Sequence, residues 1–113
     1  PHSKPGDLLI ICSGSGETSY LKVLLDKAKK NEVNVALITA NENSMLSKMS
    51  DSMLVLPGDL KDEKKHQSTV FSQPMGSNFE QLSCLTFDSL VLILMEKLNE
   101  TSESMYLRHA DFE

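Results

Sequence analysis

The sequence predicts an α/β fold in which helices cover both faces of a parallel β-sheet, the three-layer αβα arrangement. Short apolar runs of strand length alternate along the chain with segments whose apolar residues recur at helical spacing. The strand-length runs are continuously apolar, which indicates that both faces of each strand are covered. The 113 residues suffice for one domain.

Each element has its own signal. The first apolar run reads LLIIC and follows a Pro-Gly-Asp turn, and the helix after it ends in lysines, where cations are favoured. Ser44 can cap a short helix, and Pro57-Gly58 stops the third strand. The expected elements are strands over 8–12, 33–39 and 53–56 and helices over 18–30, 45–49 and 78–98. This alternation implies right-handed crossovers between parallel strands.

The rest of the chain carries a loop and a long apolar helix. The predicted organisation is a core over 5–58, a loop over 59–76 with mixed charge and no periodicity, and a helix with a tail over 77–113. The helix over 78–98 is apolar nearly all round in its second half and needs burial on more than one side. We therefore expect a homo-oligomer, a dimer or tetramer, built on this helix; the alternative is a central helix of one chain. Thr101 begins a further short helix.

The composition narrows the class of protein. The net charge of −5 and the absence of tryptophan argue against nucleic acid and anionic membranes as partners. Cys12 and Cys84 lie within apolar runs, which indicates buried free thiols in a reducing cytosol, and no metal-ligand spacing accompanies them. The longest near-apolar stretch, 90–95, is too short to span a bilayer. A cytoplasmic location is expected.

The loop Ser13–Thr18 reads SGSGET and stands between the first strand and its helix. Its hydroxyls and backbone N–H groups converge at the positive end of a helix, which is a ready site for an anion such as a phosphate monoester. It lacks the spacing of a P-loop and the third glycine of a dinucleotide fingerprint. The alternative is an ordinary strand-to-helix turn with a Ser/Thr cap.

These segments together resemble a known family. The loop Ser13–Thr18, the strand segment VALIT and residues 44–46 resemble the second half of a sugar isomerase (SIS) domain. The segment 72–81 and the tail 108–113 resemble, more narrowly, the 6-phospho-3-hexuloisomerase family. The resemblance implies an SIS-type, flavodoxin/Rossmann-like fold. It also implies that the domain is truncated at its N-terminus, because an SIS domain has a preceding strand–loop–helix unit with an arginine in its glycine/serine loop.

The resemblance also implies an activity. The family interconverts a 3-hexulose 6-phosphate and fructose 6-phosphate through a cis-enediol, without a metal or other cofactor, in the ribulose monophosphate pathway of formaldehyde fixation. The phosphate of this small-molecule sugar would be held by the hydroxyls of Ser13, Ser15 and Thr18, with help from the N–H groups of Gly14 and Gly16. Sites in SIS proteins generally form between subunits.

Moving a carbonyl between neighbouring carbons needs a base and a group that exchanges protons with the oxygens. A carboxylate in a partly apolar site and a histidine suit these roles, and Glu80 and His109 are the candidate catalytic residues. Each has a structural alternative. Ser77-x-x-Glu80 is a capping-box pattern, and a histidine near a chain end is often only a solvated surface residue.

Two other functions stay open at this stage. If a chain that lacks the first unit of the domain is not an isomerase, it is either a non-catalytic phosphosugar-binding module or a self-associating remnant. Asn78 and Asp111 also depart from the family pattern, which has an apolar residue and an asparagine at these positions.

Overall fold

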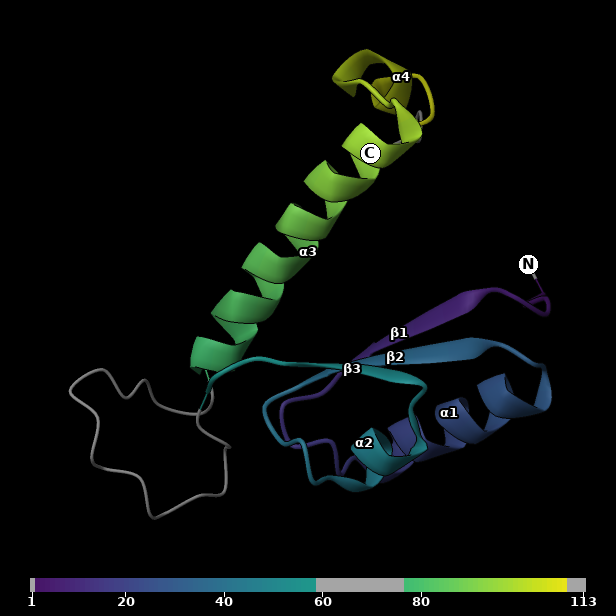
Figure 1. Ribbon diagram of the computed structural model, residues 1–113, viewed down its shortest axis with the longest axis vertical. Helices are drawn as coiled ribbons and strands as arrows, with labels where there is room; N and C mark the ends of the chain where they lie inside the picture. The colour runs from purple at the N-terminus through teal and green to yellow at the C-terminus, as the bar shows by residue number, and fades with distance from the viewer. Residues whose placement is uncertain (1, 59–76, 110–113) are drawn as a thin grey trace. The chain divides into compact units, whose positions relative to one another are not determined.

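The computed structural model describes residues 2–58 and 77–109 (Figure 1). The loop expected over 59–76 and tail residues 110–113 lie outside the described residues. The chain divides into two compact units, a first unit that ends at Ser83 and a second unit that begins at Cys84.

The first unit holds a three-stranded parallel sheet, which confirms the predicted α/β class. Its elements are β1 (Leu8–Cys12), α1 (Ser19–Lys30), β2 (Asn34–Thr39), α2 (Met45–Met49) and β3 (Ser52–Val55), with the strands in the order β1-β2-β3. Each lies within one residue of its predicted bounds. The register places Ile11 opposite Leu37 and Leu37 opposite Met53.

The core lies between the sheet and the two helices. Leu37 of β2, Leu25 of α1 and Leu46 of α2 are fully buried there, and Ile11 and Val35 complete the sheet side of the cluster. Both helices lie on the same side of the sheet (Figure 1). Successive right-handed crossovers that proceed in one direction across a sheet place their helices on one face, which explains this arrangement.

The opposite face of the sheet is largely exposed in the described part of the chain. Side chains alternate between faces along a strand, so Leu8 and Ile10 point away from the face that Ile11 shares with α1. Leu8 is 58% exposed, Ile10 37% and Leu54 46%. Neither α1 nor α2 lies on this face. Near the carboxyl end of β1, however, Ser83 of α3 (Ser77–Leu98) contacts Cys12 there, and Ile38 beside Cys12 is buried.

Two local devices fix the end of α1 and the start of β3. Glu32 adopts a left-handed conformation (φ 57°) and its N–H donates to the Lys29 carbonyl, which closes the last turn of α1. The Asp51 carboxylate, just before β3, pairs with Lys29 and accepts the Val35 N–H at 2.7 Å. The Lys29 ammonium first, and then the Val35 N–H, hold the pKa of Asp51 below its usual value.

The second unit holds most of α3 (Ser77–Leu98) and α4 (Ser102–Tyr106). Both helices were predicted. Many large apolar side chains on this part of α3 are exposed in the single chain: Leu85, Phe87, Val91, Leu92, Ile93, Leu94 and Leu98. Within the described ranges, α3 and the shorter helices lack the length or the apolar character needed to cross a membrane.

Candidate functional site

The loop Ser13–Thr18 lies at the carboxyl end of β1, and two of its backbone N–H groups donate to its own serine hydroxyls. We call it the anion loop, after the ligand that the sequence predicts for it. The Ser13 N–H continues the sheet by donating to the Ile38 carbonyl at 2.9 Å. The Gly16 N–H donates to Ser13 Oγ at 3.2 Å, and the Glu17 N–H donates to Ser15 Oγ at 3.3 Å. Both hydroxyls act as acceptors inside the loop, so each keeps its own proton for an oxygen of a bound anion. The Gly16 N–H, in contrast, is already used to shape the loop.

Thr18 occupies the N-cap position of α1 and makes no side-chain capping hydrogen bond. The first N–H groups of a helix have no acceptor within it, and the helix dipole makes that end positive. The interpretation of this loop as an ordinary turn with a Ser/Thr cap needs a capping bond that Thr18 does not make. The Thr18 hydroxyl and the first turn of α1 together can receive an anion.

Gly16 is required by close packing as well as by backbone conformation. Its φ is +64°, a left-handed conformation that side chains disfavour. A Cβ at this position would lie 2.0 Å from Ser44 Oγ and 2.5 Å from Ser44 Cβ. Ser44 is fully buried and caps α2 by accepting the Ser47 N–H. The absence of a side chain at Gly16 therefore lets the anion loop lie directly against the start of α2.

Residues 39–46, from the end of β2 to the start of α2, form hydrogen bonds to the carbonyl groups of the loop Ser13–Thr18. Three consecutive carbonyl oxygens accept these bonds. The Gly14 carbonyl accepts from the Thr39 hydroxyl (3.1 Å) and the Ala40 N–H (3.0 Å). The Ser15 carbonyl accepts from the Asn41 side-chain amide (3.2 Å), and the Gly16 carbonyl accepts from the Leu46 N–H (3.0 Å). A carbonyl oxygen repels an anion. Because these oxygens are bonded to residues 39–46, their negative charge is partly compensated. Of the three hydroxyl-bearing residues, Ser15 and Thr18 are exposed and Ser13 is buried.

Glu17 has a structural role in the same contact. Its Oε1 accepts the Met45 N–H at 2.8 Å, at the N-terminus of α2. A carboxylate is favoured at the positive end of a helix. The negative charge nearest the serines and Thr18 is thereby bonded to α2.

The first turns of α3 are anchored beside the anion loop by Phe79. Phe79 is buried, and its Cδ1 lies 3.2 Å from the place where a Cβ on Gly14 would be. On its other side, Phe79 Cβ lies 3.1 Å from the corresponding position on Gly58. The Ser83 hydroxyl donates to the Phe79 carbonyl at 2.7 Å and lies 3.4 Å from Cys12 Sγ. The structure therefore brings together the anion loop and the start of α3.

Glu80 and His109 are placed in different units. Glu80 follows Phe79 in the first turn of α3 and is exposed. His109 lies beyond α4, is exposed, and donates its backbone N–H to the Tyr106 carbonyl at 3.0 Å. The pairing of Glu80 with His109 stays a prediction.

Sequence reasoning missed the residues that hold the anion loop in place. Thr39 is a polar residue at the end of a buried strand, and that position is the signal that could have found it. Phe79 carries no signal, because an apolar residue at a helix start is common. Among residues 2–58 and 77–109 no cluster of His, Cys, Asp and Glu could hold a metal ion.

Comparison with known proteins identifies the class of this α/β protein. The model of the SIS domain family matches residues 1–85, and the chain belongs to this family. A crystal structure of a hypothetical protein superposes with a TM-score of 0.81 at 32% identity, covering 99% of this chain and 59% of that one.

The more specific likeness is to 3-hexulose-6-phosphate isomerases. The enzyme of that name from Bacillus subtilis (strain 168) is 42% identical over 113 residues, and the alignment covers this whole chain and 60% of the relative. The one from Mycobacterium gastri is 32% identical, with 56% of the relative covered. A Methanococcus jannaschii protein of known structure, for which this function has been inferred, has a TM-score of 0.80 at 25% identity, with 100% of this chain and 58% of that chain covered. The chain thus spans about three fifths of the length of these relatives.

Proposed function

We propose that this chain forms part of a 3-hexulose-6-phosphate isomerase, which interconverts a 3-hexulose 6-phosphate and fructose 6-phosphate. The observation that carries the proposal is the packing of Phe79 against Gly14. It anchors the helical turn that bears Glu80 beside a loop suited to phosphate. The relatives named 3-hexulose-6-phosphate isomerase support the choice of reaction. The reaction would belong to the ribulose monophosphate pathway.

The phosphate group would bind at the N-terminus of α1. The hydroxyls of Ser13, Ser15 and Thr18 donate to its oxygens, and the helix dipole stabilises its charge. Gly14 and Gly16 contribute by leaving room, since Phe79 and Ser44 occupy the space of their missing side chains. The hydroxyls of this loop recognise phosphate and not the sugar, so unphosphorylated fructose is expected to bind poorly.

The isomerisation needs four proton transfers on the sugar, two that form the enediol and two that resolve it. Glu80, as the base, takes the proton from the carbon next to the carbonyl, and His109 gives a proton to the carbonyl oxygen, which yields the cis-enediol. His109 then takes the proton from the other enediol oxygen, and Glu80 returns a proton to the carbon that was the carbonyl. Protons and electrons balance without a metal or cofactor. A histidine suits this role because its ring nitrogens can both donate and accept a proton.

The proposed reaction is tested by ligand binding and turnover in the same protein. Fructose 6-phosphate at a hundredfold excess over its Kd is expected to stabilise the chain by about 2.7 kcal/mol, seen as a rise in Tm, whereas fructose is not. Glu80→Gln is expected to keep this rise and to lower the isomerisation rate about 10²–10⁴-fold in a coupled assay. The matched control is Glu32→Gln, another exposed carboxylate, which should leave both unchanged.

Each result decides between the functions. No rise in Tm at millimolar fructose 6-phosphate contradicts phosphosugar binding. A rise in Tm without turnover in the unmodified chain identifies a binding module. Turnover that persists in Glu80→Gln returns Glu80 to the role of a helix cap.

We also propose that the chain forms a homo-oligomer through α3, and the exposed apolar part of this helix supports that proposal. Seven large apolar side chains of this part of α3 are exposed among the described residues, and a second copy of the helix would cover them. Sedimentation is expected to show a dimer or tetramer. Leu92→Glu should weaken association at least about 100-fold, because it buries an unpaired charge, while Val23→Glu on exposed α1 should not. A monomeric wild-type chain would contradict this interface.

A further inference from the structure

Helix α4 depends on its neighbours for order. It has five residues, and an isolated helix of that length is not stable in water. The chain enters it through a closed turn, since Asn99 is left-handed (φ 54°) and the Glu100 N–H donates to the Met95 carbonyl at 2.8 Å. This pattern ends α3 and sets the direction in which the chain leaves it.

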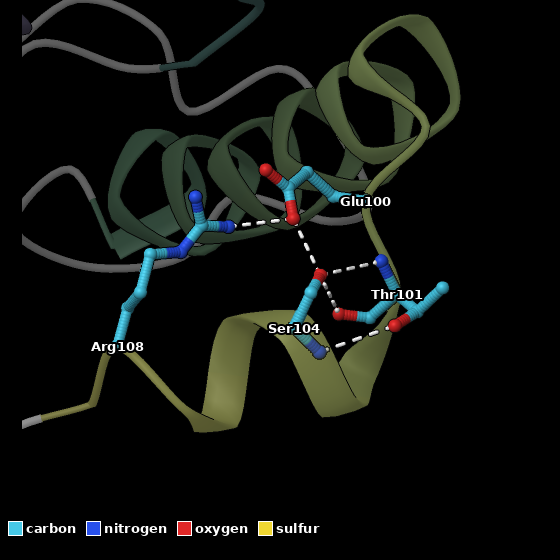
Figure 2. A network of polar contacts seen from close by, with 4 residues as sticks. All are labelled: Glu100, Thr101, Ser104 and Arg108. Carbon is cyan, nitrogen blue, oxygen red and sulfur yellow. Dashed lines mark hydrogen bonds and ion pairs between the residues drawn. The ribbon is translucent and has the colours of Figure 1, made fainter.

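A capping box then starts α4. The Ser104 N–H donates to Thr101 Oγ1 at 3.1 Å, and the Thr101 N–H donates to Ser104 Oγ at 2.9 Å (Figure 2). These two bonds satisfy donors that a helix start leaves without partners. The Ser104 Oγ acts as an acceptor here, so its proton remains for another partner.

Two acceptors lie within reach of the Ser104 hydroxyl, the Glu100 carboxylate and the Thr101 carbonyl at 2.9 Å, and Glu100 also pairs with Arg108. Figure 2 shows the Arg108 guanidinium and the Ser104 hydroxyl meeting at one Glu100 oxygen, with Arg108 at 2.6 Å. The Arg108 contact first, and then the Ser104 hydroxyl, hold the pKa of Glu100 below its usual value. The Glu100 side chain is only 23% exposed, compared with 62% for Arg108. One carboxylate therefore ties the start of α4 to the turn beyond its end.

His109 directly follows Arg108 in the sequence. The Arg108 N–H donates to the Met105 carbonyl at 3.1 Å, and the His109 N–H donates to the Tyr106 carbonyl at 3.0 Å. Arg108, the residue before His109, is therefore fixed both by its side chain, which pairs with Glu100, and by its backbone N–H.

We propose that Glu100 is a positioning residue for His109, acting through the guanidinium of Arg108. Glu100 needs no contact with the substrate for this role. The effect on catalysis rests on the proposed function, in which His109 exchanges protons with the sugar oxygens. The ordering of His109 by Glu100 is independent of that function.

The test compares the Glu100→Gln variant of the 113-residue chain with the wild type, and Glu103→Gln is the matched control. Glu103 is an exposed carboxylate in the first turn of α4. In Glu100→Gln, the His109 amide should exchange with solvent about three- to tenfold faster, and its imidazole resonances should move toward those of a flexible chain. The resonances of His2, which is exposed, serve as an internal reference. The kcat for isomerisation should fall about tenfold or more with KM unchanged, because His109 is displaced and the phosphate loop is not.

Further variants separate the outcomes. The charge exchange Glu100→Arg with Arg108→Glu should restore part of the His109 protection, which loss of an unrelated contact would not. Unchanged exchange and resonances of His109 in Glu100→Gln would overturn the proposal, as would equal effects of Glu103→Gln. If the wild-type chain shows no turnover, the proposed function fails, whereas the NMR results still decide whether Glu100 orders His109.

Discussion

Gly16→Ala is expected to destabilise the first unit by about 2–5 kcal/mol and to abolish the stabilisation by fructose 6-phosphate. The new methyl group would lie 2.0 Å from the buried Ser44 Oγ, and the φ of +64° adds backbone strain. Relief of the clash must move either the anion loop or the start of α2. Movement of the loop separates the hydroxyls of Ser13 and Ser15 from Thr18, and phosphate binding is lost.

The matched control for Gly16→Ala is Gly6→Ala. Gly6 also has a positive φ, +89°, but nothing lies within 4 Å of its missing Cβ. This variant carries the backbone strain without the clash and is expected to cost only about 1 kcal/mol. Urea unfolding of both variants, with and without fructose 6-phosphate, separates the two causes. Equal losses of stability would show that the contact with Ser44 has no energetic weight.

Phe79→Ala is expected to lower the free energy of unfolding by about 3–5 kcal/mol, because it leaves a cavity at a buried aromatic position. The start of α3 then loses its contacts with Gly14 and Gly58. Amides 80–83 should exchange faster, and kcat for isomerisation should fall because the turn that carries Glu80 is no longer held.

Phe79→Leu is the control for this substitution. It keeps an apolar side chain of similar volume and is expected to cost less than about 1.5 kcal/mol. Its amide exchange over 80–83 and its turnover should stay near those of the wild-type protein. If Phe79→Ala is no less stable than Phe79→Leu and turns over equally fast, the packing of α3 on the anion loop has no functional role.

Most of the secondary structure could be predicted because its signals are local. The apolar run Leu8–Cys12, the cap at Ser44 and the capping pattern at Thr101 each depend on residues within a few positions of one another. The anion site in the loop Ser13–Thr18 is predicted from signals that are equally local, since its hydroxyls lie within one hexapeptide. The face on which each helix lies could not be read in this way, because it depends on the order of the strands in the sheet; α1 and α2 both lie on one face.

The sequence by itself determined the type of each element and the family to which the chain is similar, and it predicts an anion site in the loop Ser13–Thr18. The tertiary structure alone decided how that loop is held, because its contacts join distant positions. Thr39 is 25 positions from Gly14, whose carbonyl it binds, and Ser83 is 71 positions from Cys12. Short-range patterns carry no record of such contacts. The anchoring of Phe79 against Gly14, which places the Glu80 turn beside the loop, is therefore visible only in the folded chain.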